Sequence, residues 1–183
     1  MPVARPEPSE YAPYYGKYVG LVEGEDVLRA LGEQIDDSLA TLRGVSAPES
    51  LGPYAPGKWS LREVVGHLID AERIFAYRAL RFARNDKTEL PGFEQNDYVP
   101  AGRFDSRSLP DLIAEWELVR RGNILMFRGL DADAWLRRGV ASQNEMSVRA
   151  LAHVIAGHEL HHMKIVRERY LGGRSSAGGP PVG

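Results

Sequence analysis

Histidines are concentrated toward the carboxyl end of the chain, where four of the five fall within ten residues. These four are His153, His158, His161 and His162. On a helical wheel of about 100° per residue, His158 and His162 lie on the same side of the helix. That side also carries the apolar residues Leu151, Val154 and Ile165. Both imidazoles are therefore predicted to point toward the core, whereas His153 is expected on the surface and His161 on the flank.

Imidazoles that point inward need a polar partner, because burying an unsatisfied polar group costs roughly 1–3 kcal/mol. A divalent metal ion is the partner that fits two imidazoles one helical turn apart. The remaining histidine, His67, is the candidate third ligand, because it lies on the apolar side of another predicted helix. Three imidazoles leave coordination positions open for water or substrate, which is typical of catalytic sites. Zinc and nickel are the expected ions, with iron and manganese as alternatives.

The second histidine segment also matches the zinc-peptidase motif H-E-x-x-H, from His158 to His162. The glutamate of that motif is a general base, so Glu159 is a candidate catalytic residue, expected at the rim of the site. A peptidase needs a further ligand downstream. The only acidic residue after His162 is Glu168, which belongs to the same predicted helix and cannot close the site. The three-histidine site is therefore the better interpretation.

Four amphipathic helical segments carry these residues, with apolar side chains at three- and four-residue spacing. The segments span residues 25–42, 60–84, 108–127 and 147–171, with an extra turn at 131–137. Ser60 and Glu63 have the spacing of a capping box, and Trp135 is expected to fold back on the bundle. The pattern predicts an all-α four-helix bundle without a convincing strand. Because the connections are long, crossovers are expected between the helices.

Two of these connections are rich in proline. Residues 44–58 are predicted to form a loop, and residues 85–107 are long enough to form a lid over a pocket. Candidate pocket contacts in the lid are Phe93, Glu94, Asp97 and Tyr98. The bundle domain is expected over residues 25–171, between an arm (1–24) and a flexible tail (172–183). The tyrosines of the arm are expected to pack on the domain surface.

Composition narrows the class of protein. The 183 residues are 43% hydrophobic and 26% charged, with a net charge of −2, so nucleic acid is not an expected partner. The absence of cysteine excludes disulfides, thiolate ligands and a cysteine nucleophile. No stretch of about 18 apolar residues is present, so no membrane partner is expected. A cytoplasmic protein is the default expectation, since no signal sequence is recognisable.

Two blocks of sequence resemble the DinB-like superfamily. They are the Trp-Ser-x-Arg-Glu-Val-x-x-His block at residues 59–67 and the Gly-His-Glu-Leu-His-His block at 157–162. The chain is most similar to the branch of YfiT-like metal-dependent hydrolases that also contains bacillithiol S-transferases. The resemblance implies a four-helix bundle, often a homodimer, with a divalent metal ion on three histidines. It places the ligands at His67, His158 and His162, and a pocket loop at residues 90–98.

Three functions remain open. The first is a metal-dependent enzyme on a small molecule, either a hydrolase or a thiol S-transferase that uses an external low-molecular-weight thiol. The second is a non-catalytic metal-binding or stress-response module, and the third is a helical dimerisation domain. Helix 60–84 also carries a run of basic residues: Arg62, Arg73, Arg78, Arg81 and Arg84. A solvated face paired with acidic residues is the simplest interpretation of this run, and a clamp for an anionic substrate is the alternative.

Overall fold

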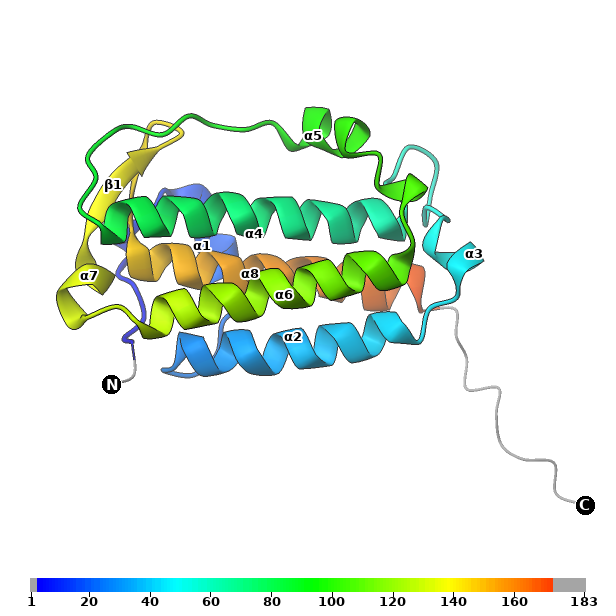
Figure 1. Ribbon diagram of the computed structural model, residues 1–183, viewed down its shortest axis with the longest axis horizontal. Helices are drawn as coiled ribbons and strands as arrows, with labels where there is room; N and C mark the ends of the chain where they lie inside the picture. The colour runs from blue at the N-terminus through cyan, green and yellow to red at the C-terminus, as the bar shows by residue number, and fades with distance from the viewer. Residues whose placement is uncertain (1–2, 173–183) are drawn as a thin grey trace, which may run out of the picture.

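Four long helices form a bundle in the computed structural model, which describes residues 3–172 (Figure 1). They are α2 (Val27–Arg43), α4 (Leu61–Ala83), α6 (Leu109–Arg128) and α8 (Val148–Ile165), the last extended by the π-helical turn η4 (Val166–Tyr170). The predicted four-helix bundle is therefore confirmed, and each long helix lies within a few residues of its predicted bounds. Residues 173–183 of the expected tail lie outside the described residues.

The order of the helices around the bundle confirms the crossovers. Helix α4 packs against α6 and α8, and α2 packs against the same two helices. The consecutive helices α2 and α4 therefore lie across the bundle from each other, as do α6 and α8. The connections between these pairs must cross an end of the bundle, which is why they are long.

Side-chain caps fix where the long helices begin. Asp26, Ser60, Ser108 and Ser147 each accept a hydrogen bond from a backbone N–H of the first turn. Ser60 and Glu63 form the predicted capping box at the start of α4. Such a cap is worth about 1 kcal/mol. The cap of α4 places His67 two turns into the helix, within the bundle.

The connections contain more regular structure than predicted. Residues 44–58 include the short helix α3 (Ala47–Ser50), and the predicted lid includes α5 (Gln95–Gly102) and η3 (Phe104–Ser106). Figure 1 shows α5 above α4, on the outside of the bundle. The Phe104 ring packs so closely on α4 that a Cβ atom at Gly66 would lie 2.2 Å from it. The Phe104 side chain thus fixes this connection on α4.

A small antiparallel hairpin contradicts the expectation that the chain has no strand. It pairs β1 (Arg138–Ala141) with β2 (Asn144–Ser147) and follows the predicted turn, α7 (Ala132–Leu136). The hairpin turn places Ser142 and Gln143 at φ values of 51° and 63°. Glycine or asparagine normally signals such left-handed positions, and neither residue occupies them here. Trp135 stacks on Phe127 at 5.4 Å, as predicted.

The described part of the N-terminal arm is packed on the bundle. It forms η1 (Pro8–Glu10), η2 (Pro13–Tyr15) and α1 (Gly16–Val19), and α1 lies directly on α8. A Cβ atom at Gly157 would lie 2.0 Å from the backbone oxygen of Tyr18. Only glycine therefore allows this approach. The ion pair between Glu10 and Arg149 holds the start of the arm on the same helix.

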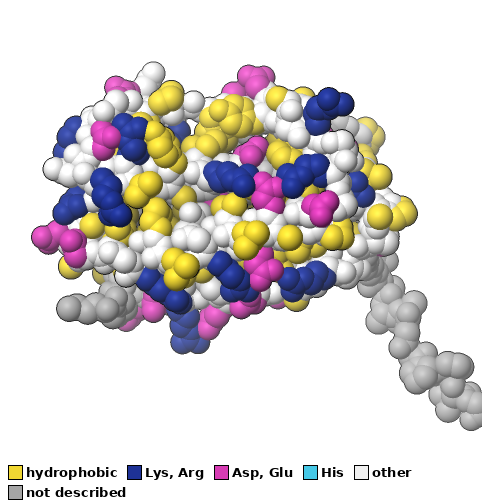
Figure 2. All heavy atoms as spheres, viewed as in Figure 1, with side chains coloured by type: hydrophobic (Ala, Val, Ile, Leu, Met, Phe, Trp, Pro, Cys, Tyr) yellow, Lys and Arg dark blue, Asp and Glu magenta, His cyan; other side chains and the backbone are white. Residues whose placement is uncertain are grey.

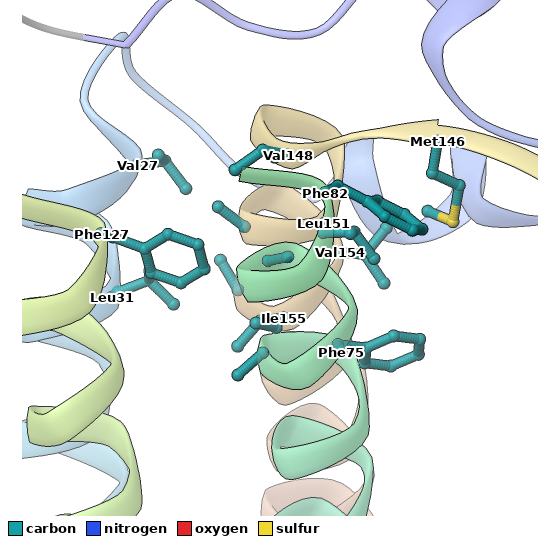
Figure 3. Packing of buried hydrophobic residues seen from close by; sticks show 14 of the residues in the cluster. Val27, Leu31, Phe75, Phe82, Phe127, Met146, Val148, Leu151, Val154 and Ile155 are labelled. Atoms are coloured by element: carbon teal, nitrogen blue, oxygen red, sulfur yellow. The ribbon is translucent and has the colours of Figure 1, made fainter. Parts of the chain in front are cut away.

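Apolar side chains fill the bundle in two clusters, one near each end. Figure 3 shows the first, where Phe127 and Leu31 on one side face residues of α8 such as Ile155. One buried polar network links all four long helices. Arg120 of α6 is ion-paired with Glu72 of α4 and Glu159 of α8, and Glu159 accepts a hydrogen bond from Ser38 of α2.

Charges of both signs alternate on the outer face formed by α4, α6 and α2 (Figure 2). They include the ion pairs Arg73–Glu115 and Arg121–Glu117. The expectation of a solvated, paired basic face is therefore correct for Arg73. Within residues 3–172, no helix combines the length and apolarity that a membrane crossing requires.

Candidate metal centre

Three imidazoles meet between α4 and α8. His67 comes from α4, and His158 and His162 come from successive turns of α8. One nitrogen from each ring lies within 4.8 Å of the others, and the two Nε2 atoms of His67 and His158 are 3.1 Å apart. The sequence predicted this juxtaposition, and the contact between α4 and α8 produces it.

The surroundings of these rings keep them uncharged. His67 and His158 are 3% and 6% exposed. Burial lowers the pKa of His67 to about 4. Burial, with smaller contributions from the neighbouring histidines and Lys17, lowers the pKa of His162 to about 3 and that of His158 well below its usual value. All three imidazoles are therefore neutral at pH 7.

The donor set suits a divalent transition metal ion. Neutral imidazole is the form that ligates a metal, and nitrogens about 2.0–2.1 Å from a tetrahedral zinc ion lie about 3.3 Å from one another. The separation of 3.1 Å between His67 and His158 is close to this, and all three nitrogens lie within 4.8 Å of one another. Without a shared ion, the two buried imidazoles of His67 and His158 would have to satisfy each other. Within residues 3–172, this is the one group of three or more candidate ligands that converges in this way.

A cavity of about 280 Å³ opens beside His67 and His158. Its aromatic lining is Tyr14, Tyr15, Tyr18, Phe75 and Phe93. The tyrosines of the arm pack on the bundle, as predicted, and Tyr14, Tyr15 and Tyr18 also form one wall of the cavity. The Tyr18 ring lies edge-on to His158 at 5.3 Å. Sequence inspection missed these contacts, although the Tyr14-Tyr15-x-x-Tyr18 spacing is that of one helical face.

Polar groups line the rest of the cavity: Arg78, Glu94, Gln95, Asn96 and Ser142. Of the four lid residues predicted as contacts, Phe93 and Glu94 are on the wall. Tyr98 lines a neighbouring hollow with Phe93, and Asp97 is exposed. Ser142 comes from the hairpin turn and was not predicted. A larger hollow of about 970 Å³ lies between α2 and α6, and no described histidine lines it.

Glu159 does not occupy the predicted rim position. Its side chain is 1% exposed, and one carboxylate oxygen accepts a hydrogen bond from Ser38 while the other is ion-paired with Arg120. Burial raises the pKa of Glu159, and the charge of Arg120 opposes that rise. A carboxylate held in this way is a cross-link between helices. The structure therefore gives no support to Glu159 as a general base.

Two other positional expectations have opposite outcomes. His153 is buried, not on the surface, and its Nδ1 atom lies 2.8 Å from the backbone oxygen of Arg149. His161 is half-buried on the flank of α8, as predicted, with its ring 5.5 Å from that of Tyr18. Neither belongs to the group of three.

Comparison with known proteins places the fold. YfiT from Bacillus subtilis, described as a probable metal-dependent hydrolase with an unusual four-helix bundle topology, aligns with a TM-score of 0.67 and 15% identity. The alignment covers 93% of this chain and 94% of YfiT. A mycothiol-dependent maleylpyruvate isomerase aligns with a TM-score of 0.63 and 12% identity, over 79% of this chain and 61% of the isomerase.

Comparison at the level of sequence identifies the family of the chain. No curated protein matches this chain. The family model of the DinB superfamily matches residues 30–166, which include α4, α6, most of α2 and α8 up to the π-helical turn. This match spans most of the chain and includes all three converging histidines. The chain therefore belongs to the DinB superfamily.

Proposed function

We propose that this protein is a metal-dependent enzyme that acts on a small molecule, with one divalent ion held by His67, His158 and His162. The observation that carries the proposal is the convergence of three neutral imidazoles, two of them buried and one half-buried, beside a cavity. A structural metal site is usually closed by four protein ligands, whereas three ligands beside a cavity leave room for a substrate. The description of YfiT as a probable metal-dependent hydrolase supports the same class of function.

The chemistry of the site follows from its charges. When bound to three neutral imidazoles, a divalent ion keeps its full positive charge and supplies Lewis acidity that favours ionisation of water or of a thiol at neutral pH. The protein contributes by holding the imidazoles neutral through burial and by lining the cavity beside them with aromatic rings. No glutamate base is assigned, because Glu159 is occupied by Arg120 and Ser38.

Hydrolysis and thiol transfer both fit this arrangement. The chain has no cysteine, so transfer needs a thiol from outside, whereas hydrolysis needs only water. The mycothiol dependence of the structurally similar isomerase makes thiol transfer a reaction to test. Zinc and nickel are the ions that we expect, because imidazole nitrogens suit both.

Metal analysis of the full chain, purified without an affinity column that carries nickel, tests the site. We expect about one divalent ion per chain in the wild type, and little or none in His67→Ala and His158→Ala. The matched control is His161→Ala, because His161 lies on the same helix outside the group of three and should leave metal content unchanged. Equal metal content in all four proteins would refute the assignment of ligands.

A substrate screen with and without a low-molecular-weight thiol then separates the reactions. Esters and amides converted without the thiol would indicate a hydrolase, and electrophiles consumed only with the thiol would indicate a transferase. Turnover that persists in the metal-free chain or in His67→Ala would contradict a metal-dependent mechanism. A chain that binds the ion but converts nothing would support the non-catalytic module.

A further inference from the structure

Arg78 is a buried cation on the wall of the histidine cavity. It lies on α4 and is 2% exposed, which makes it one of the largest fully buried side chains among the described residues. A guanidinium stays protonated in proteins, so the charge remains in place even where burial lowers the pKa. The interpretation of the basic run as a solvated face is therefore wrong at this position.

The partners of Arg78 are all neutral. One guanidinium nitrogen donates to the backbone oxygen of Pro91 at 2.9 Å and to the Ser142 hydroxyl at 3.0 Å. The Tyr15 hydroxyl is its remaining hydrogen-bonding contact. Among residues 3–172, no carboxylate forms an ion pair with it. Glu94, on the same wall, instead caps α5 by accepting a hydrogen bond from the Asn96 backbone.

The described chain has two other buried arginines, Arg62 and Arg120. Arg120 is ion-paired with two carboxylates. Arg62 has no carboxylate partner, but three of its guanidinium nitrogens donate to four neutral acceptors. Burying a charge is expensive unless it is paired. Arg78 thus shares the lack of a carboxylate partner with Arg62, and of these three buried arginines it is the one that lies on the cavity wall.

The distances between side chains connect this charge to the histidines. The guanidinium carbon of Arg78 lies 5.8 Å from the centre of the Phe75 ring, and that ring lies 6.1 Å from the His158 ring. Phe93 flanks the same guanidinium at 5.9 Å. A small molecule that reaches from Arg78 to His158 therefore passes along aromatic faces, which favours an apolar body with a charged end.

We propose that Arg78 binds a carboxylate of the substrate, so that the cavity takes small organic acids whose apolar body lies against Phe75 and whose reacting group faces the three histidines. The planar guanidinium fork matches the two oxygens of a carboxylate. The cavity volume of about 280 Å³ limits the substrate to metabolite size. This inference rests on the proposed function for the reaction, but the anion site itself can be tested without metal.

Calorimetric titration of the metal-free full chain with phenylacetate and with phenylacetamide tests the proposal. The two probes have nearly the same shape and differ in charge, and omitting the metal prevents the carboxylate from binding an ion. We expect wild type to bind phenylacetate at least tenfold more tightly. Arg78→Met should abolish this preference, and Arg78→Lys should reduce it, because lysine keeps the charge and loses the fork.

Arg84→Met is the matched control, because Arg84 lies at the exposed end of the same helix and its loss changes net charge equally. It should keep the wild-type preference. Equal binding of the two probes by wild type, or an unchanged preference in Arg78→Met, would overturn the proposal. If Arg78→Met does not fold, intermolecular NOEs between phenylacetate and the wild type test the proposal instead. Contacts from phenylacetate to the Phe75 and Phe93 rings would support the proposed site, and contacts only to other residues would overturn it.

The outcomes separate this inference from the proposed function. If the chain binds one metal ion but does not distinguish the two probes, the proposed carboxylate site is refuted and the proposed metal-dependent function still stands. If the chain prefers phenylacetate but binds no metal, the proposed carboxylate site is supported and the proposed metal-dependent function is refuted.

Discussion

Replacing Arg120 with methionine should destabilise the bundle more than any nearby surface change. Arg120 is 1% exposed and donates to both oxygens of Glu72, at 2.7 and 2.9 Å, and to Glu159 at 2.5 Å. Methionine fills similar space but leaves two buried carboxylates without their cation. Removing one partner of a buried ion pair typically costs 3–5 kcal/mol, so we expect a loss of about 4 kcal/mol in the free energy of unfolding.

Urea denaturation of the metal-free chain, followed by circular dichroism at pH 7, measures this loss. With a slope of about 2 kcal/mol per molar urea, the midpoint should fall by about 2 M. The matched control is Arg121→Met, because Arg121 is the next residue on α6 and its ion pairs with Asp36 and Glu117 are exposed to solvent. Its midpoint should scarcely move, since exposed ion pairs contribute little.

A triple variant tests the physical cause. Arg120→Met combined with Glu72→Gln and Glu159→Gln removes the cation and both acids, so no uncompensated charge is left. We expect it to recover part of the lost stability, because the desolvation cost of the carboxylates disappears. A midpoint for Arg120→Met equal to that of Arg121→Met would refute the role of the buried network. A triple variant less stable than Arg120→Met would refute the charge argument.

Two further predictions concern the arm. Burial raises the pKa of Glu10, but hydrogen bonds from Arg149 and Ser147 outweigh this effect and hold the pKa at about 2. The Glu10 carboxylate therefore stabilises the fold above pH 4.5, and this contribution is lost as the pH falls toward 2. In urea titrations, Glu10→Gln should thus lower the free energy of unfolding by about 1–2 kcal/mol at pH 7 and by less at pH 3. A difference between variant and wild type that does not change with pH would contradict this. Gly157→Ala should lower the free energy of unfolding by about 1–3 kcal/mol, because the added Cβ meets the Tyr18 backbone. Gly122→Ala is the control and should be neutral or stabilising, because the space around Gly122 is open. Equal thermal midpoints for the two variants would contradict the close packing of the arm on α8.

Local sequence patterns determined the helices and the spacing of the histidine pair. Capping side chains, prolines and apolar periodicity act over one or two turns, so the beginnings of α4, α6 and α8 could be read directly. His158 and His162 are one turn apart on any α-helix, whatever surrounds it. His67 was placed on the inner side of α4 by the same periodicity. The resemblance to the DinB-like superfamily added that these two helices meet.

Burial on the remaining sides of α8 could not be predicted from periodicity. A helical wheel assumes one buried face, but α8 is covered by α4, α2 and the short helix α1 together, and residues 150–159 are all buried. The predicted exposure of His153 and the rim position of Glu159 were wrong for this reason. The hairpin was missed because its turn has no glycine or asparagine at the left-handed positions.

The sequence by itself thus determined which residues could ligate a metal and which segments are helical, because both depend on interactions within a few residues. Only the tertiary structure decided what surrounds the ligands. The arm brings Tyr15 to the cavity, the hairpin brings Ser142, and both meet Arg78 from α4. These three side chains come from segments far apart in the chain. Their meeting depends on how the connections cross the bundle, and no local pattern encodes that.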